Sequence, residues 1–142
     1  MKQDEDAYQV VWLIRRLFRA LATKSDEILS DLGLTAADRA VMEFLYPGES
    51  LTVPEIATRY QVSRQHIQST VNRLITAGYV VATDNPEHKR SSLMELTAEG
   101  KATFRKIRLR DAKAIARLFA KIPVRDRSVT RLTLSRLLEE ID

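Results

Sequence analysis

Residues 63–74 read SRQHIQSTVNRL, and this stretch decides the fold. Its apolar residues Ile67, Val71 and Leu74 recur at helical spacing, which predicts a helix fixed to a core along one side. The other positions carry hydrogen-bonding or basic side chains, and no acidic residue occurs from Ser63 to Ala82. Ser63 is well suited to cap the helix N-terminus. The stretch therefore predicts a capped helix with one buried face and one polar face without acid.

A short helix is expected directly before this one. Thr52 and Glu55 form a T-x-x-E capping box, and Pro54 lies in the first turn, where its missing N–H costs little. Only Gln61 and Val62 separate the end of this helix, near residue 60, from the cap of the next. Two helices joined by so brief a turn indicate a helix-turn-helix.

A β-hairpin is expected after Gly78, because the apolar period changes there from 3.6 to about 2. The two strands are predicted at residues 79–83 and 92–96, joined by a polar loop with Lys89 and Arg90 at or near its tip. An exposed basic tip on a short ribbon can reach the minor groove of DNA, whose negative potential attracts arginine.

Longer helices are expected on both sides of this central segment. An amphipathic helix is predicted over roughly residues 8–32, ending near Gly33, and a second helix follows Thr35 and stops at Pro47. Two more are predicted at residues 97–121 and about 124–141, separated by Pro123. The expected class is mainly α with a small β-hairpin wing: a winged helix-turn-helix at residues 35–96, flanked by helical regions at 1–34 and 97–142.

Composition excludes several classes of protein. The chain has 142 residues, of which 44% are hydrophobic and 30% charged, which is typical of a globular protein. No run of 18 apolar residues occurs and the acidic N-terminus lacks the layout of a signal peptide, so no membrane partner and a cytoplasmic location are expected. The chain has no cysteine, which excludes disulfides and thiolate metal sites. Because no catalytic set, phosphate-binding glycine loop or metal-ligand spacing is visible, we expect neither an enzyme nor a cofactor.

Basic charge is concentrated away from the helix-turn-helix. Of the 23 Lys and Arg residues, 12 lie between Lys101 and Arg136, where only Asp111 and Asp126 are acidic. Residues 35–96 contain six basic and seven acidic residues, a net charge of −1. The surplus at residues 101–136 has three interpretations: a solvated helix face, an anion site, or an additional support for bent DNA.

The polar face of residues 63–74 has the side chains that read base edges. Arg, Gln, Asn and Ser match the donors and acceptors of the major groove, whereas carboxylates would repel the phosphates. A helix-turn-helix delivers the start of its second helix to those edges. An ordinary solvated face is the alternative, and the ordered set of capped helix, brief turn, acid-free helix and basic hairpin tip favours DNA. The candidate DNA-binding residues are Ser63, Arg64, Gln65, His66, Gln68, Ser69, Asn72, Arg73, Lys89 and Arg90.

The stretches VPEIATRYQVSRQHIQSTVNRLITAGYV and DNPEHKRSSLMELTAEGK resemble the MarR family of winged-helix transcriptional regulators. The helix-turn-helix, the wing and the strand-to-helix junction at residues 96–100 follow that family's pattern, and the similarity in layout covers essentially the whole chain. The resemblance implies a homodimer, in which residues 1–34 and 97–142 form the dimerisation region. It also implies that two recognition helices enter successive major grooves of a pseudo-palindromic operator on double-stranded DNA.

One position departs from the family's pattern. The family usually has an aspartate two residues before the wing-tip arginine, and this chain has His88 before Arg90. Either Asp84 or Glu87 replaces the missing carboxylate, or the wing is looser. His88 offers a possible pH dependence of DNA binding, with an ordinary exposed loop histidine as the alternative.

The last helix gives an independent indication of dimerisation. It carries more apolar side chains than one small subunit can bury, although a monomer with the helix folded back is the alternative. These residues are Leu132, Leu134, Leu137, Leu138 and Ile141.

The resemblance further implies a repressor that is released by a small effector. Many members of the family leave DNA when a phenolic or carboxylate compound binds between the dimer helices and the reading domain. Trp12 would stack on an aromatic ring, and Arg16 or Arg19 would pair with a carboxylate. The alternative places Trp12 in core or interface packing and the two arginines on a solvated face. The alternative function is a module that binds protein instead of DNA. The net charge of −1 over residues 35–96 is compatible with this alternative.

Overall fold

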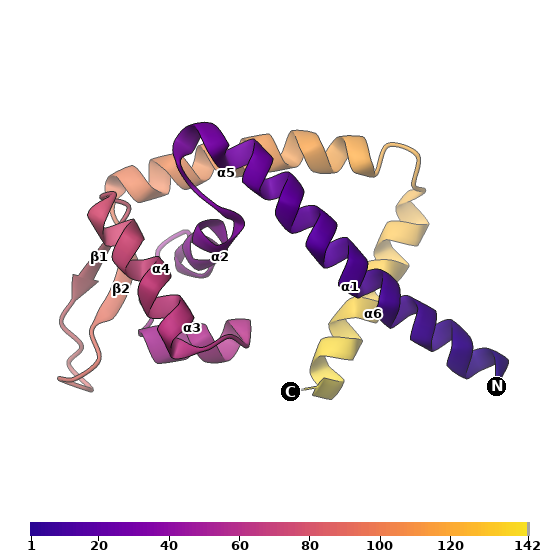
Figure 1. Ribbon diagram of the computed structural model, residues 1–142, viewed down its shortest axis with the longest axis horizontal. Helices are drawn as coiled ribbons and strands as arrows, with labels where there is room; N and C mark the ends of the chain where they lie inside the picture. Colours follow the sequence, from indigo (N-terminus) through magenta and orange to yellow (C-terminus); the bar gives the residue numbers. More distant parts are fainter. Residues whose placement is uncertain (142) are drawn as a thin grey trace. The chain divides into compact units, whose positions relative to one another are not determined.

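The computed structural model describes residues 1–141. Its helices and strands follow the chain in the order drawn in Figure 1. They are α1 (Lys2–Leu29), a 3-10 turn (Ser30–Leu32), α2 (Ala36–Leu45), α3 (Val53–Tyr60), α4 (Arg64–Thr76), β1 (Val80–Thr83), β2 (Leu93–Leu96), α5 (Ala98–Leu118) and α6 (Val124–Ile141). The chain divides into two compact units, Met1–Ile107 and Arg108–Asp142, and the boundary lies within α5. The mainly helical class with a hairpin wing is therefore confirmed.

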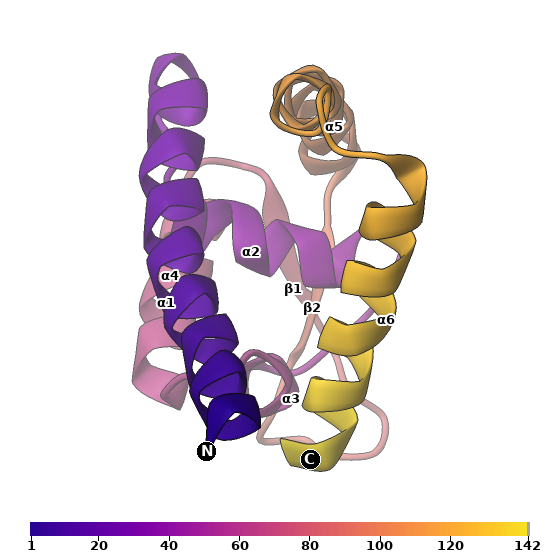
Figure 2. The ribbon, with the colours of Figure 1, turned by 90° about the vertical axis from the view of Figure 1, so that its right-hand side faces the viewer.

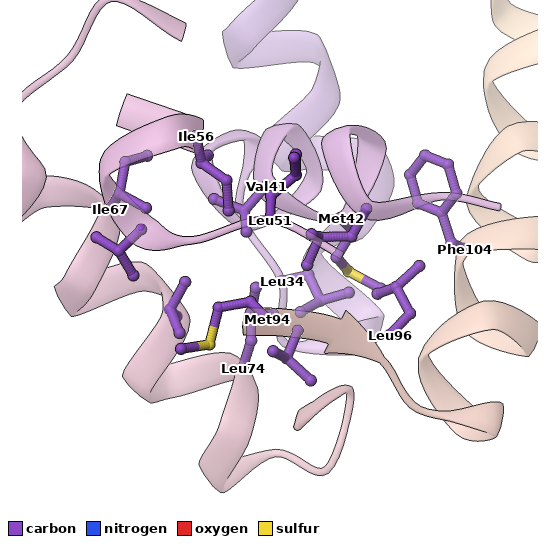
Figure 3. Packing of buried hydrophobic residues seen from close by; sticks show 14 of the residues in the cluster. Leu34, Val41, Met42, Leu51, Ile56, Ile67, Leu74, Met94, Leu96 and Phe104 are labelled. Atoms are coloured by element: carbon purple, nitrogen blue, oxygen red, sulfur yellow. The ribbon is translucent and has the colours of Figure 1, made fainter. Parts of the chain in front are cut away.

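The first unit is built around one hydrophobic core, shown in Figure 3. Every element from the end of α1 to the first half of α5 contributes to it. The aromatic ring of Phe104 on α5 lies against Tyr46, with ring centroids 4.9 Å apart. The buried apolar residues are Leu29, Leu34, Val41, Met42, Leu45, Leu51, Val53, Ile56, Ala57, Ile67, Val71, Leu74, Val80, Met94, Leu96, Phe104 and Ile107.

The hairpin is antiparallel, with Val80 paired to Leu96 and Thr83 to Leu93. Its strands begin one residue later than the sequence pattern predicts. Leu51 extends this sheet, which the sequence pattern does not predict. Its N–H and carbonyl form hydrogen bonds of 3.2 and 2.7 Å with the backbone of Met94. A single bridging residue leaves no period in the sequence, so the hydrophobic pattern could not predict it.

The first and fifth helices have boundaries that differ from the prediction. The first helix begins at Lys2 rather than near Tyr8, because Asp4 and Glu5 are favourable in a first turn even though they are not apolar. The fifth helix ends at Leu118 rather than Lys121. Beyond it, the Arg127 guanidinium donates hydrogen bonds of 3.0 Å to the carbonyl oxygens of Phe119 and Ile122. These bonds occupy carbonyls of the turn that follows α5.

The second unit consists of the end of α5 and α6, whose axes diverge sharply after Pro123 (Figure 2). A groove of about 480 Å³ lies between these two helices and is lined by apolar and polar side chains, including Phe119, Arg127 and Leu134. The Arg127 guanidinium lies 5.7 Å from the Phe119 ring centroid. None of the α6 residues is buried within the chain.

Large apolar side chains remain exposed on α1 and on both helices of the second unit. Trp12 and Phe18 on α1 are 47% and 61% exposed, and Leu138 and Ile141 on α6 are 61% and 70% exposed. Exposed apolar surfaces of this extent are typical of interaction sites. Within residues 1–141, no helix has the combination of length and apolar character needed to cross a membrane.

Candidate nucleic-acid interface

Helix α4 is fixed to the core along one side. Ile67, Val71 and Leu74 are 0%, 0% and 1% exposed, and they come one helical turn apart. Full burial of three such side chains contributes roughly 1.5–3 kcal/mol each. Thr70 is also buried and donates a hydrogen bond of 3.0 Å to the carbonyl oxygen of His66. The opposite face of α4 is thus held toward solvent.

The start of α4 is capped as the sequence predicts. The Ser63 hydroxyl oxygen accepts a hydrogen bond of 3.0 Å from the backbone N–H of His66. The first turn contains no acidic side chain. The backbone N–H groups at the start of the helix therefore carry a partial positive charge that can attract an anion. The geometry suits a phosphate group.

The turn before α4 has a defined shape. Thr52 and Glu55 form the predicted capping box of α3, with hydrogen bonds of 3.2 and 3.3 Å between side chain and backbone. Gln61 then adopts a left-handed conformation at φ 58°, and the N–H of Val62 bonds the carbonyl of Ala57 at 3.1 Å. This C-cap ends α3 and directs the chain into α4 within two residues.

The structure brings all the predicted α4 site residues onto one exposed surface. Gln68 donates a hydrogen bond of 2.9 Å to the side-chain oxygen of Asn72, so these two amides are held together one turn apart. No acidic side chain lies on this helix. The residues on the surface are Ser63, Arg64, Gln65, His66, Gln68, Ser69, Asn72 and Arg73.

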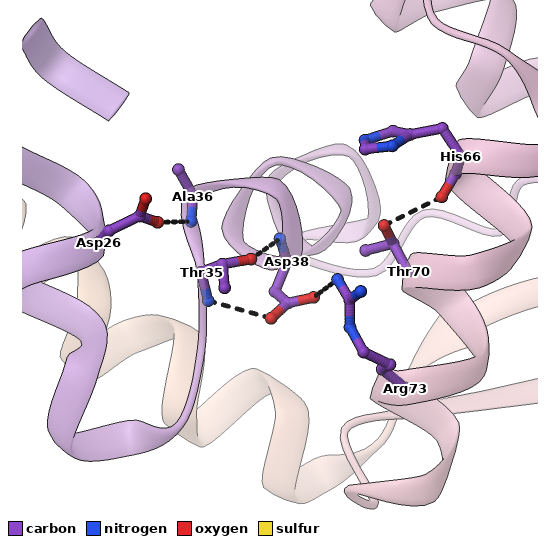
Figure 4. Close-up of polar contacts among 7 residues, drawn as sticks. All are labelled: Asp26, Thr35, Ala36, Asp38, His66, Thr70 and Arg73. Carbon is purple, nitrogen blue, oxygen red and sulfur yellow. Dashed lines mark hydrogen bonds and ion pairs between the residues drawn. The ribbon is translucent and has the colours of Figure 1, made fainter. Parts of the chain in front are cut away.

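Arg73 differs from the rest because it is already engaged. Its guanidinium donates to Oδ1 of Asp38 at 2.8 Å, and the Asp38 side chain is only 5% exposed (Figure 4). The sequence pattern predicts a helix after Thr35 but not this pair. The two residues are 35 positions apart, and no local spacing rule relates α2 to α4.

The wing carries the other two candidates. Lys89 and Arg90 are exposed in the loop between β1 and β2. Within the described residues, Arg90 has no ion pair with Asp84 or Glu87, the two carboxylates named as substitutes for the family's aspartate. The base of the wing is tied to the loop before α3, because Ser50 donates a hydrogen bond of 2.6 Å to Glu95.

The three candidate effector residues lie on exposed parts of α1. Trp12, Arg16 and Arg19 follow helical spacing and share one face of the helix. They belong to the first unit, whereas the groove between α5 and α6 belongs to the second. Across residues 1–141, no cluster of three or more metal-ligating side chains is present.

Comparison with known proteins gives one family. The model of the MarR family matches residues 32–91, which span α2 to the loop of the wing. An HTH-type transcriptional repressor of Mycobacterium tuberculosis is 29% identical over 113 residues, covering 77% of this chain and 81% of the relative. The multiple antibiotic resistance protein MarR of Escherichia coli is 29% identical over 106 residues, covering 72% and 74%.

Solved structures agree with these sequence matches. A crystal structure of a MarR family transcription regulator aligns with a TM-score of 0.82 at 25% identity, covering 98% of this chain and 94% of the other. A MarR transcriptional regulator from Methanosarcina mazei has the same fold, with a TM-score of 0.86 over 94% of this chain and 96% of the other at 16% identity.

Proposed function

Because this chain is a MarR-type winged-helix transcription regulator, we propose that it represses transcription as a homodimer bound to a pseudo-palindromic operator. The same family relationship makes it a regulator rather than an enzyme. The observation that carries the proposal is the capped helix α4, whose buried side fixes it to the core and whose exposed side has no acidic residue. A relative at 29% identity is named a transcriptional repressor, which supports the direction of regulation.

We assign base reading to the exposed side chains near the start of α4. Recognition helices place their N-terminal residues against base edges, and Arg, Gln, Ser and Asn provide the matching donors and acceptors. Gln68 and Asn72 are bonded to each other, so either can present its remaining donor or acceptor to adenine. Lys89 and Arg90 on the wing would approach the backbone or the adjacent minor groove.

Exposed apolar surface supports the dimer. In the second unit, the apolar side chains of Val129, Leu132 and Leu138 are 47–61% exposed, and apolar side chains exposed together in this way are typical of an interaction site. A second copy of the chain would bury them, and two-fold symmetry would then present two α4 helices to a palindrome.

Selection of bound fragments from a random DNA pool tests this function. The wild-type protein should enrich an inverted repeat with half-sites about one helical turn apart. An Arg64→Glu variant should enrich no motif, whereas Lys24→Glu on α1, which also replaces an exposed basic residue, should enrich the same motif as wild type. Binding that depends on neither sequence nor salt would contradict the proposal and favour a module that binds protein.

We propose that a small aromatic carboxylate acts as effector at Trp12, Arg16 and Arg19. Trp12 is the only tryptophan of the chain, so its fluorescence reports directly on a bound ring. Benzoate should quench it and release operator DNA over the same concentration range. Arg16→Gln should weaken both effects together, while Lys24→Gln should change neither. Release of DNA without a change in Trp12 fluorescence would place the effector elsewhere.

A further inference from the structure

The two carboxylate oxygens of Asp38 make different contacts, one within the cap of α2 and one with Arg73 on α4. Its Oδ2 accepts a hydrogen bond of 3.0 Å from the backbone N–H of Thr35, and the Thr35 hydroxyl oxygen accepts one of 3.3 Å from the N–H of Asp38. Its other oxygen, Oδ1, holds the Arg73 guanidinium at 2.8 Å. The capping box therefore fixes a buried carboxylate in one orientation, and Arg73 reaches that fixed point from α4 (Figure 4).

The turn that holds Asp38 is itself anchored to α1. The Asp26 carboxylate of α1 accepts a hydrogen bond from the backbone N–H of Ala36. The amides of two successive residues, Thr35 and Ala36, are thus bonded by carboxylates from different helices. Because the N–H groups of Thr35 and Ala36 are both hydrogen-bonded, the turn holds the Asp38 carboxylate in place. The Arg73 guanidinium must therefore take the orientation that this carboxylate requires.

The ion pair with Asp38 makes Arg73 a poor base reader. Within residues 1–141, it is the one predicted α4 site residue that makes an ion pair. If the guanidinium turned to a guanine, it would leave a buried carboxylate without its cation, which is strongly unfavourable.

We propose that Arg73 is a positioning residue, which sets the orientation of α4 relative to α2 through Asp38 and does not read a base. This inference rests on the proposed DNA-binding function. Helices α2 and α4 also pack against each other through apolar side chains, and the pair adds a directional contact near the C-terminal end of α4. A small rotation of α4 about its buried side would move Gln65 and Ser69 away from the base edges that the proposed function assigns to them.

A double-mutant cycle on DNA binding tests the proposal. Asp38→Asn removes the charge but keeps an oxygen for the Thr35 N–H, and Arg73→Gln removes the guanidinium. Each single variant should bind the selected operator at least about tenfold more weakly than wild type. The affinity of the double variant should be no lower than that of the single variant with the lower affinity. Binding to unrelated DNA and the salt slope of log K should stay as in wild type, because no phosphate contact is lost.

Control variants separate positioning from direct contact and from unfolding. Arg64→Gln should lower the salt slope by about 0.9 and add to the effect of Asp38→Asn. Arg73→Lys keeps a cation for Asp38 and should recover much of the affinity. A purely structural role would reduce the fraction of active protein, measured by stoichiometric titration, and leave the dissociation constant of that fraction unchanged. That result would overturn the proposal.

Two further outcomes decide the matter. If Asp38→Asn binds the operator like wild type while Arg73→Gln loses affinity and salt slope, Arg73 contacts DNA directly and the proposal is wrong. If the wild-type protein selects no sequence, the proposed function fails, yet the positioning claim is still tested in the free protein. Asp38→Asn should then shift the backbone amide resonances along residues 64–76, and unchanged resonances would refute it.

Discussion

The Thr97 hydroxyl donates a hydrogen bond of 2.7 Å to the carbonyl oxygen of Gly78, and so fastens the start of α5 to the end of α4. The same oxygen accepts the N–H of Gly100 at 3.0 Å and caps α5. The N–H of Thr97 bonds the carbonyl of Tyr79 at 3.0 Å. The backbone and side chain of Thr97 therefore join the turn between the recognition helix and the first strand of the wing to the helix that leads to the second unit.

Replacement of Thr97 by valine removes this hydroxyl with little change of shape. We expect the free energy of unfolding to fall by about 1–2 kcal/mol, because a cap and a hydrogen bond are lost. Urea unfolding followed by circular dichroism measures the change. Thr58→Val on the exposed side of α3 is the matched control and should alter stability by less than about 0.5 kcal/mol. Equal losses in the two variants would contradict the role of Thr97.

Gly100 is required for the close approach at the same junction. A Cβ atom at this position would lie 2.1 Å from the carbonyl oxygen of Tyr79, which is backbone and cannot rotate away. Gly100→Ala should therefore lower the free energy of unfolding by about 2 kcal/mol or more, from a forced backbone shift. Gly48→Ala has open space around its Cβ and should be tolerated. A thermal melt of both variants compares them, and equal midpoints would refute the steric argument.

Ser63 allows capping and DNA contact to be separated. Ser63→Ala removes the acceptor for the His66 N–H and should cost about 1 kcal/mol of stability. Ser63→Asp restores an N-cap and should regain that stability, but its charge would repel a phosphate. We expect the aspartate variant to fold like wild type and to bind operator DNA poorly in a fluorescence anisotropy titration. Wild-type affinity in this variant would remove the start of α4 from the interface.

The helices were predictable because their signals are local. The T-x-x-E box at Thr52, the cap at Ser63 and the spacing of Ile67, Val71 and Leu74 are all contained within one or two helical turns. The predicted core side of α4 is confirmed by burial, whereas the neighbouring Ile75 is 39% exposed. Its place at the edge of the apolar stripe leaves it only partly covered.

The contacts that orient α4 were not predictable in the same way. Arg73 is a basic residue on the polar face of α4, and Asp38 is an acidic residue in the cap of α2. The local sequence explains the presence of each residue without the other. Their pairing depends on how α2 packs on α4, which is a tertiary property. The assignment of Arg73 to DNA binding stays a prediction, and its ion pair with Asp38 supports the competing proposal that Arg73 is a positioning residue.

The wing-tip arginine should act through charge. Arg90→Ala should weaken operator binding and reduce the salt slope of log K by about 0.9, the effect of losing one phosphate or groove contact. Lys121→Ala, in the turn after α5, removes the same charge from the second unit and should leave the slope unchanged. Titrations at several potassium chloride concentrations measure both slopes. Equal decreases would mean that total charge, rather than the wing, determines the slope.

Exposed apolar residues of α6 should control assembly. Leu138 is 61% exposed in the single chain, and a second copy would bury it. Leu138→Glu would place a carboxylate in that apolar contact, so we expect dimerisation to weaken at least about tenfold. Light scattering after size-exclusion chromatography measures the mass, which should approach the 16.2 kDa of one chain at micromolar concentration.

The control for assembly is an apolar residue on the wing. Val81 on β1 is 42% exposed, so Val81→Glu introduces the same charge on a surface outside the expected dimer contact. Its mass should remain that of the wild-type dimer. A wild-type protein that elutes as a monomer would contradict the dimer itself, since the exposed side chains of α6 would then have no second copy to bury them. An unchanged dimer in Leu138→Glu would place the contact on other apolar residues, such as those of α1.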